Sequence, residues 1–405
     1  MKKNISLLLA VIMIFSLVLT ACNKADQNKD DNSTTAETTA PDTTEAETTT
    51  LEITTTEEIT TTEEITTEPP VVINTVTLLA VGDNLIHGYL ITAGKKFGFD
   101  KFYHRIKDTI SAADIAIINQ ESCFTYNEKE YSGYPRFSSP IGVGEAAIAA
   151  GFDVFTLATN HTWDKGEQQI IDTLDFFSKH PEATALGIHA TQDTLYEPVI
   201  IEKNDIKIAM LNFSYGSNRT QKVWWRMNTL SNGNKSAIKT MLQKAEENAD
   251  ITIVIPHWGT EYKYVPSSYQ ISWAKFFTEN GADVIIGHHP HAVQPMMTVE
   301  ADNGNSAVCF YSLGNFISNQ TTMKGNVGGM ASLTIVKENG VTRVEDTKLI
   351  PTTVQAEMIG KTRTYEAMLL SDLTPELLAK SFKFKDNTVE EFWDLFNMAS
   401  TSYPK

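Results

Sequence analysis

The sequence predicts an α/β protein whose folded part begins near residue 74. Short runs rich in Val, Ile, Leu and Phe recur along the chain, and each is followed by Gly, Asn, His or Pro. Segments with apolar residues at three- and four-residue spacing separate several of these runs, which indicates amphipathic helices. Alternating strands and helices predict a layered α/β domain. A mixed sheet, or two sheets packed between helices, fits this order better than a purely parallel sheet.

The elements follow from these patterns in chain order. The predicted strands are 75–82, 114–119, 153–159, 207–213, 251–256, 283–287 and 308–312. The predicted helices are 102–110, 144–150, 168–177, 236–248 and 269–280. Residues 331–337 and 341–354 predict an antiparallel hairpin, because Asn339-Gly340 supplies the positive φ of a tight turn. In the tail, 375–380 and 388–398 are predicted helices.

The first 21 residues predict a secretory signal. Two lysines precede an apolar run over residues 5–19, which closes with Leu19-Thr20-Ala21-Cys22. These four residues resemble the lipobox of bacterial lipoproteins. That likeness implies cleavage before Cys22, lipidation of its thiol, and an extracytoplasmic protein anchored to the cell membrane. A plain transmembrane anchor is the alternative, although the run is shorter than the roughly 20 residues that a span needs.

Residues 22–73 form a Thr- and Glu-rich stretch with few large apolar side chains. Such a composition buries too little apolar surface to offset chain entropy, so we predict a disordered, self-repelling stalk behind Cys22. Residues 23–73 hold 13 acidic residues and two lysines, which is most of the formal net charge of −17. The rest of the chain is acidic too. This balance argues against a nucleic-acid partner, which needs a basic face.

The remaining chain is long enough for one large domain or two smaller ones. We place the main domain at residues 74–354 and a partly helical C-terminal extension at 355–405. Its two cysteines, Cys123 and Cys309, are too far apart in sequence to suggest a disulfide framework. We expect both to be buried free thiols.

Residues of metal-ligand type stand where several predicted strands stop. Asp83 follows the first strand, Glu121 ends the second, Asn160 and His161 follow the third, and His257 follows the fifth. The carboxyl ends of strands in an open α/β sheet converge on one crevice, where such folds bind ligands and metals. Taken singly, each residue has a plainer interpretation, such as a turn, a helix cap or a packed side chain.

The stretch Gly287-His288-His289-Pro290-His291 makes the metal interpretation the stronger one. In an extended or turning His-x-His segment, residues i and i+2 point to the same side. Neutral imidazole is the commonest protein ligand for borderline metals. Together with the other strand ends, these histidines predict a site for a divalent metal, Mn, Zn, Fe or Mg.

Taken in order, six motifs resemble those of the CapA family. They are Gly82-Asp83, Asn119-Gln120-Glu121, Asn160-His161, His257-Trp258-Gly259, Gly287-His288-His289-Pro290-His291 and Ser312-Leu313-Gly314-Asn315-Phe316. The resemblance runs over residues 75–354. That family is associated with poly-γ-glutamate capsule synthesis. The resemblance implies an α/β fold, namely a four-layer metallophosphoesterase-like αββα sandwich with mixed sheets.

Metallophosphoesterases hold two divalent cations, so the resemblance also implies a role for each ligand-type residue. Glu121 would bridge the cations. The residues implied for one cation are Asn160, His257 and His289, and those implied for the other are Asp83 and His291. His161 would be the catalytic acid, and Asp164, three residues further on, would orient it.

One position departs from the phosphoesterase pattern. Those enzymes usually carry His two residues after the first Asp, and Leu85 stands there in this chain. His87 would substitute only if the loop bends back. We therefore expect one well-furnished cation site and a second that is weak or empty.

Three residues are candidates for substrate binding. Arg136 carries a planar guanidinium that suits a carboxylate or phosphate. Asn315 follows a bend at Gly314, and His288 lies beside the predicted ligand pair. A surface role for the arginine and a structural role in the loop for the asparagine are the alternatives.

Two functions from different classes remain open. In the first, the protein is a metal-dependent, phosphoesterase-like hydrolase that acts outside the membrane on a phosphoester or an anionic envelope polymer, in capsule biosynthesis or export. In the second, it is a non-catalytic component that binds the polymer or the membrane subunits of a capsule synthase through a degenerate metal crevice. Fold alone does not decide between them.

Overall fold

The computed structural model describes residues 72–404. The predicted signal, Cys22 and nearly all of the predicted stalk lie outside the described residues. Within residues 72–404, none of the helices combines the length and apolar character that a membrane span requires.

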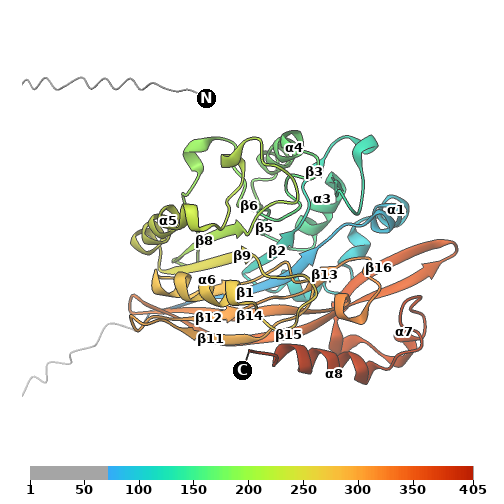
Figure 1. Ribbon diagram of the computed structural model, residues 1–405. Helices are drawn as coiled ribbons and strands as arrows, with labels where there is room; N and C mark the ends of the chain where they lie inside the picture. Colours follow the sequence, from blue (N-terminus) through green and yellow to red (C-terminus); the bar gives the residue numbers. More distant parts are fainter. Residues whose placement is uncertain (1–71, 405) are drawn as a thin grey trace, which may run out of the picture. The chain divides into compact units, whose positions relative to one another are not determined.

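Two mixed β-sheets form the centre of the fold (Figure 1). The larger sheet has the order β16 (Thr362–Leu369), β15 (Val341–Ile359), β14 (Val327–Glu338), β1 (Ile73–Asn84), β2 (Ile115–Gln120), β5 (Val154–Thr156) and β6 (Thr184–Leu186), with β13 (Asn315–Ile317) paired to the end of β1. The smaller sheet has the order β11 (Met296–Glu300), β12 (Ser306–Phe310), β10 (Val284–Ile286), β9 (Ile251–His257), β8 (Ile206–Ser214) and β7 (Val199–Lys203). A separate pair, β3 (Phe124–Thr125) and β4 (Ser139–Pro140), lies outside both sheets.

Side-chain alternation along the strands shows that the two sheets pack face to face. Successive residues of a strand point to opposite faces. In β1, Leu78 and Ala80 join one apolar core, whereas Val81 joins another. The first of these cores also contains Ile208 of β8 and Ile253 of β9, so it fills the space between the sheets. Burying each such aliphatic side chain contributes about 1.5–3 kcal/mol.

Helices cover the outer faces of both sheets. The core on the outer face of the larger sheet contains residues from α1 (Gly88–Phe97), α2 (Lys107–Ser111), α3 (Ile141–Ala149) and α4 (Glu167–Ser178). The core on the outer face of the smaller sheet contains residues from α5 (Lys235–Asn248) and α6 (Ser268–Glu279). The arrangement is the αββα sandwich with mixed sheets that the resemblance implies. It confirms two sheets between helices and excludes the single mixed sheet.

Most of the predicted elements are confirmed, and the exceptions have local causes. All seven predicted strands and all five predicted helices lie within or overlap observed elements. The predicted helix 102–110 is wrong over its first half, where a 3-10 turn (Asp100–Phe102) and a bend precede the short α2. Its apolar residues are nevertheless buried, so the spacing indicated a buried face and not a continuous helix. The sequence analysis missed α1, which contains Gly88 and Gly94, and glycine disfavours helix.

The predicted hairpin is confirmed. Strands β14 and β15 pair antiparallel from Val327↔Thr353 to Glu338↔Val341. Asn339 and Gly340 form the turn with φ values of 50° and 81°, the left-handed conformation that this residue pair tolerates. The two predicted buried free thiols, Cys123 and Cys309, are also confirmed.

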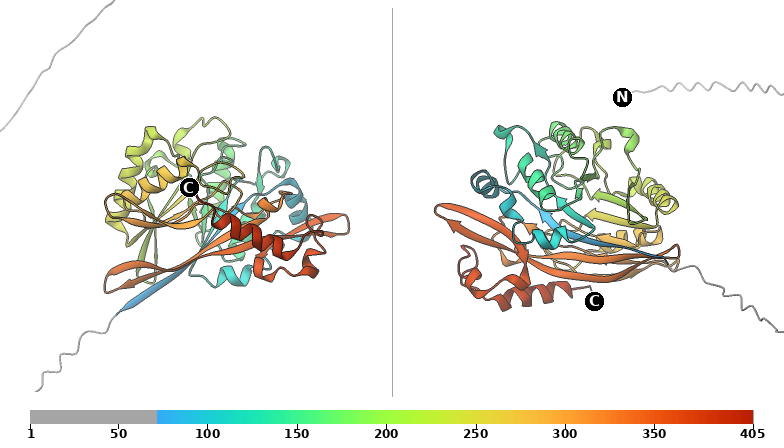
Figure 2. Two further views of the ribbon diagram at one scale, coloured as in Figure 1. Left: turned by 60° about the horizontal axis from the view of Figure 1, so that its bottom comes forward. Right: turned by 180° about the vertical axis from the view of Figure 1, so that it is seen from behind.

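The C-terminal part of the chain continues the larger sheet. Strand β15 runs on to Ile359, so the boundary predicted at residue 354 falls inside it, and β16 pairs with β15 along its full length. Helices α7 (Pro375–Leu378) and α8 (Val389–Ser400) then pack in a further apolar cluster with β14 and β16. Figure 2 shows α8 against the larger sheet from two further directions.

One lysine ties this C-terminal part to the loop over residues 318–326. Lys383 Nζ donates to the carbonyl oxygen of Gln320 at 2.8 Å, to Asn326 Oδ1 at 3.1 Å and to the carbonyl oxygen of Ser318 at 3.4 Å. Burial, with a further contribution from the charge of Arg363, lowers the pKa of Lys383 to about 7. The ammonium is therefore held by neutral oxygens at an electrostatic cost.

We predict that Lys383 makes stability depend on pH. An unfolded lysine keeps its proton to about pH 10, whereas folded Lys383 releases it near pH 7. Between these values the unfolded chain binds more protons, so the free energy of unfolding rises with pH. Urea denaturation should show wild type gaining stability relative to Lys383→Met from about pH 7 to pH 10.

The matched control is Lys380→Met, which removes an exposed lysine from the same segment. Its stability should stay parallel to that of wild type at all pH values. A constant difference between wild type and Lys383→Met over this range would show that Lys383 titrates normally.

Candidate metal centre

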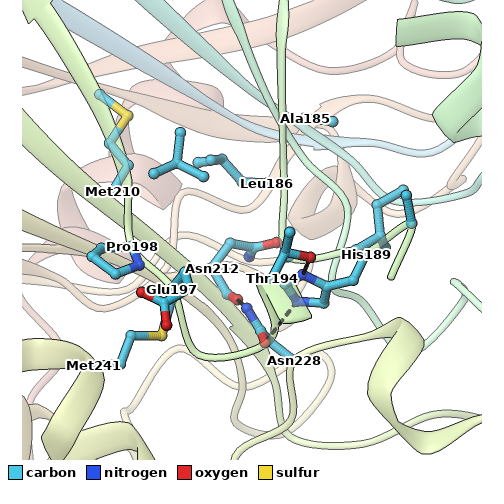
Figure 3. Close-up of a pocket in the computed structure, with 14 residues that line it drawn as sticks. Ala185, Leu186, His189, Thr194, Glu197, Pro198, Met210, Asn212, Asn228 and Met241 are labelled. Carbon is cyan, nitrogen blue, oxygen red and sulfur yellow. Dashed lines mark hydrogen bonds between the residues drawn. The ribbon is translucent and has the colours of Figure 1, made fainter. Parts of the chain in front are cut away.

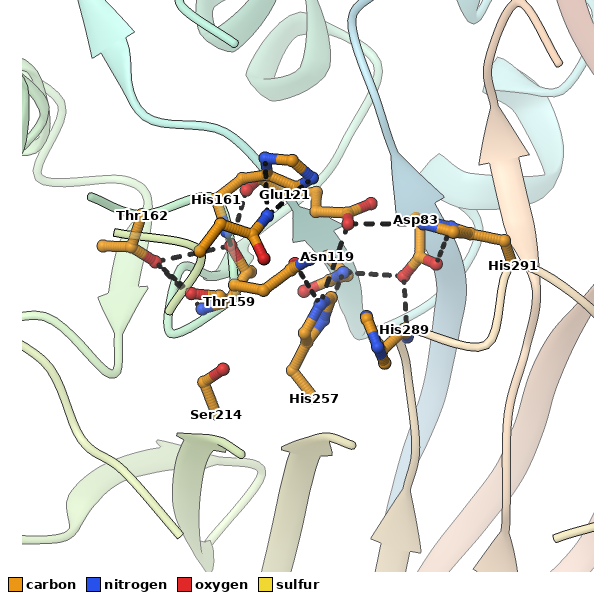
Figure 4. Close-up of polar contacts among 12 residues, drawn as sticks. Asp83, Asn119, Glu121, Thr159, His161, Thr162, Ser214, His257, His289 and His291 are labelled. Carbon is orange, nitrogen blue, oxygen red and sulfur yellow. Dashed lines mark hydrogen bonds and ion pairs between the residues drawn. The ribbon is translucent and has the colours of Figure 1, made fainter. Parts of the chain in front are cut away.

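The ends of strands from both sheets meet at one crevice (Figure 4). Asp83 and Glu121 come from the larger sheet, at the ends of β1 and β2, and His257 ends β9 of the smaller sheet. A bridge between His257 and His288 joins the end of β9 to the segment after β10. Trp258 N donates to the carbonyl oxygen of His288 at 3.0 Å, and this bond holds the two segments together.

Gly82 allows the larger sheet to place Asp83 in this crevice. A Cβ atom at residue 82 would lie 2.1 Å from the carbonyl oxygen of Gly314, so only glycine fits. Asp83 N donates to that same oxygen at 2.8 Å. Asn119 then orients the carboxylate, because its Nδ2 donates to Asp83 Oδ1 at 2.8 Å. The sequence analysis quoted Asn119 in a motif but gave it no role.

The histidine stretch turns sharply. His289 and His291 both have positive φ values, 95° and 53°, which cost non-glycine residues energy and are concentrated at functional sites. The turn, and not an extended strand, brings both imidazoles to the same side, with ring centres 6.0 Å apart. The ring centres of His257 and His289 lie 4.8 Å apart.

Glu121 stands between the imidazoles. Its Oε1 lies 3.7 Å from His257 Nε2 and 3.6 Å from His291 Nε2. His257 Nε2 also lies 2.9 Å from Asn160 Oδ1, and His291 Nδ1 lies 2.9 Å from Asp83 Oδ2. Residues separated by more than a hundred positions in the chain thus meet around one carboxylate.

The centre contains buried polar atoms that the described residues do not satisfy. Both carboxylate oxygens of Glu121, Nδ1 of His289 and both ring nitrogens of His288 are buried without a hydrogen-bond partner in residues 72–404. Each such atom costs about 1–3 kcal/mol. A divalent cation would satisfy the Glu121 oxygens and the His289 nitrogen at once, so the residues present fit a metal.

Three sets of ligand atoms lie close enough to share a cation. They are Glu121 with His257 and His289, Asp83 with Glu121 and His291, and Glu261 with His289 and His291, all with ligand atoms within 4.8 Å of one another. The first two sets contain five of the predicted metal ligands, and Asn160 adjoins the first through His257.

The pKa values of the centre are split by burial and by neighbouring charge. Burial raises the pKa of Glu121 to about 8, partly offset by His291. Burial lowers the pKa of His289 to about 3 and holds that of His257 well below its usual value. For His291, the charges of Glu121 and Asp83 outweigh burial and raise the pKa to about 10. Neutral His257 and His289 have lone pairs free for a metal.

His161 and Asp164 form a pair at the edge of the centre. His161 Nδ1 lies 2.7 Å from Asp164 Oδ2, which also accepts from Phe137 N at 2.7 Å. Burial lowers the pKa of His161, but the Asp164 hydrogen bond and the charge of Glu121 raise it overall. Asp164 therefore fixes the ring and favours its protonated form.

Three other predicted residues lie in different surroundings. Asn315 Oδ1 lies 2.9 Å from His291 Nδ1, so this side chain holds an imidazole that is itself a candidate ligand. His288 is buried but belongs to none of the three ligand sets. The Arg136 side chain is exposed, and within residues 72–404 its guanidinium makes no hydrogen bond or ion pair.

His87 does not replace the missing histidine. Leu85 is buried, and the His87 ring packs edge-on against Phe137 with ring centres 5.2 Å apart. His87 Nδ1 lies 3.3 Å from Asn319 N, and His87 is absent from all three ligand sets.

Sequence reasoning missed Glu261, a member of the third set. The available signal was Gly259, which follows His257-Trp258 and lets the chain turn back towards the strand ends.

A separate cavity of about 360 Å³ lies between β6 and β8 (Figure 3). Its polar groups are paired with one another. His189 Nε2 lies 2.9 Å from Asn228 Oδ1, and His189 Nδ1 lies 3.0 Å from Thr194 Oγ1. None of the three ligand sets lines it, so it does not compete with the crevice as a metal centre.

Fold and site together define a class, the two-sheet αββα proteins with a buried, histidine- and carboxylate-rich centre of divalent-metal type at their strand ends. Residues 77–320 match the family described as bacterial capsule synthesis protein PGA_cap. The chain belongs to that family.

Two curated relatives carry related names. The chain is 28% identical over 271 residues to PGA biosynthesis protein CapA of Bacillus subtilis, which covers 66% of this chain and 70% of the relative. It is also 28% identical over 259 residues to capsule biosynthesis protein CapA of Bacillus anthracis, covering 60% of each. Among solved structures, calcineurin-like phosphoesterase YfkN from Bacillus subtilis matches with 16% identity and a TM-score of 0.43, over 82% of this chain and 99% of that one.

We predict that Glu121→Gln removes most of the stabilisation by metal. A ligand that binds only the folded state raises its stability by about 2.7 kcal/mol at a hundredfold excess over Kd. Mn²⁺ should therefore raise the Tm of wild type and of the control Glu145→Gln, which changes an exposed carboxylate on α3. It should raise the Tm of Glu121→Gln much less, because the tighter ion loses its carboxylate ligand.

Without metal, Glu121→Gln should be at least as stable as wild type, because it removes an unpaired buried carboxylate. An equal Mn²⁺-induced rise in Tm for Glu121→Gln and wild type would exclude Glu121 as a ligand.

Proposed function

We propose that this protein is a divalent-metal-dependent hydrolase of capsule biosynthesis or export, acting outside the cell membrane on a phosphoester or on an anionic envelope polymer. The observation that carries the proposal is the unpaired, fully buried Glu121 carboxylate between His257 and His291, with the His161–Asp164 pair beside it. The name of the Bacillus subtilis relative, PGA biosynthesis protein CapA, supports poly-γ-glutamate as the polymer.

The mixed ligand set bears on the identity of the metal. Imidazole nitrogens together with carboxylate oxygens suit Mn²⁺, Fe²⁺ and Zn²⁺ better than Mg²⁺, which prefers oxygen ligands. A bound cation would act as a Lewis acid towards a phosphoryl or carbonyl oxygen.

The chain's own residues supply the remaining chemistry. Asp164 is hydrogen-bonded to Nδ1 of His161, so Nε2 of this ring is left to donate a proton to a departing oxygen. Burial of Asp83 and Glu121 keeps water from the carboxylates and strengthens every charge interaction in the crevice. Asn315 holds His291 in place, and Asn119 holds Asp83.

The departure at Leu85 favours a second candidate function. A centre with an incomplete second cation site suits recognition of an anionic polymer, or docking to the membrane subunits of a capsule synthase, without turnover. Activity measurements separate the two.

We predict that His161→Ala lowers kcat for hydrolysis of a generic aryl phosphate with Mn²⁺ by about 10²–10⁴-fold, the usual contribution of a general acid. His289→Ala should abolish activity and the tighter Mn²⁺ binding. The control is His104→Ala, an exposed histidine that belongs to none of the ligand sets, which should leave the rate unchanged.

Unchanged rates in both site variants would exclude the enzyme proposal. If wild type binds Mn²⁺ and poly-γ-glutamate but hydrolyses neither the aryl phosphate nor the polymer, the recognition proposal stands instead.

Attachment to the membrane is the remaining part of the proposal, and it rests on the lipobox-like sequence before Cys22. We predict that Cys22→Ser moves the protein from the membrane fraction to the soluble fraction in a bacterial host, because lipidation needs the thiol. Thr35→Ala, in the acidic stretch, should stay with the membrane. Membrane-bound Cys22→Ser protein would point to a transmembrane anchor.

A further inference from the structure

The loop after β9 returns to the metal centre. Gly259 has a φ of 93°, and a Cβ there would lie 2.6 Å from the buried Gln270 side chain, so the turn requires glycine. Two residues later the chain is tied to the histidine stretch, because Tyr262 N donates to the carbonyl oxygen of Pro290 at 2.7 Å. The loop therefore runs beside the residue that separates His289 from His291.

A second contact fixes this loop from the other side. Lys324 Nζ donates to the carbonyl oxygen of Tyr262 at 2.9 Å, and the Tyr262 ring lies 5.9 Å from that of His291. Glu261 precedes Tyr262, so its backbone is held at the mouth of the crevice while its side chain stays exposed.

Glu261 has the chemistry of a ligand. One of its carboxylate oxygens lies within 4.8 Å of a ring nitrogen of both His289 and His291. The imidazoles are buried and Nδ1 of His289 has no hydrogen-bond partner within residues 72–404. Nor does the Glu261 carboxylate have a hydrogen bond or ion pair in that range, so it is free to bind a cation.

Glu261 lies on the side of the centre where an expected imidazole ligand is absent. Leu85 stands where an imidazole is expected, on the side of the centre that contains Asp83 and His291, and His87 belongs to none of the ligand sets. His291 is common to the Asp83 set and the Glu261 set, so Glu261 reaches the deficient side from the smaller sheet.

We propose that Glu261 is a ligand of a second divalent cation, which it binds together with His291 in place of the imidazole that is absent at Leu85, while His289 stays with the first cation. The inference rests on the proposed function, since it deepens the same centre. An imidazole together with a carboxylate suits Mn²⁺, Fe²⁺ or Zn²⁺. Because Glu261 is exposed and the Glu121–His257–His289 set is buried, the second cation binds with lower affinity and exchanges faster than the first.

Calorimetric titration of Mn²⁺ into the metal-free full-length protein tests the inference, with free Mn²⁺ followed in parallel by electron paramagnetic resonance. Wild type should bind two Mn²⁺ ions with different affinities. Glu261→Gln should keep the tighter ion and bind the second at least tenfold more weakly, since loss of even an indirect metal contact costs 10–100-fold in affinity.

The matched control is Glu247→Gln, which changes an exposed carboxylate on α5 and should bind both ions as wild type does. Since Glu261 is exposed, the variant should fold normally, and its thermal melt without metal verifies this.

The outcomes separate this inference from the proposed function. Equal second affinities in wild type and Glu261→Gln, or a single ion in wild type, would overturn the role of Glu261 and leave the buried centre intact. No Mn²⁺ binding by wild type would overturn the proposed function as well.

Discussion

A carboxylate buried without a partner is the constraint on which the rest of the centre depends. Glu121 is fully buried, and none of the residues in 72–404 hydrogen-bonds either oxygen. Its burial costs free energy, because the carboxylate loses the hydration that it would have at an exposed position. The two sheets explain the placement, since Glu121 arrives from the larger sheet while His257 arrives from the smaller one. A cation between the sheets would recover the cost.

Around this carboxylate, identical side chains behave differently according to their neighbours. His257 and His289 are surrounded by other imidazoles and by apolar burial, so their pKa values fall and their lone pairs stay available. His291 faces Asp83 and Glu121, so its pKa rises. Perturbation of this kind, in opposite directions within one crevice, is characteristic of functional sites. Bound metal would replace the proton that His291 carries.

Much of the fold could be predicted from the sequence because apolar strand runs and the Asn339-Gly340 turn are local signals. The ligand-type residues at strand ends could be predicted for the same reason, since parallel strands share an edge. Glu261 could not, because its position depends on the Gly259 turn and on the bond from Tyr262 to Pro290. The sequence also could not predict that His87 is not a ligand, because this depends on its packing against Phe137. The continuation of the sheet into β16 was missed although β15 and β16 form a hairpin, because its turn is Gly360-Lys361 and not the stronger Asn-Gly signal.

Diffraction data collected at the Mn absorption edge from crystals grown with Mn²⁺ test the central claim most directly. The account predicts an anomalous peak bonded to Glu121, His257 and His289 at about 2.0–2.2 Å from each nearest oxygen or nitrogen. A crevice without an anomalous peak at saturating Mn²⁺, with Glu121 hydrogen-bonded to ordered water, would contradict it.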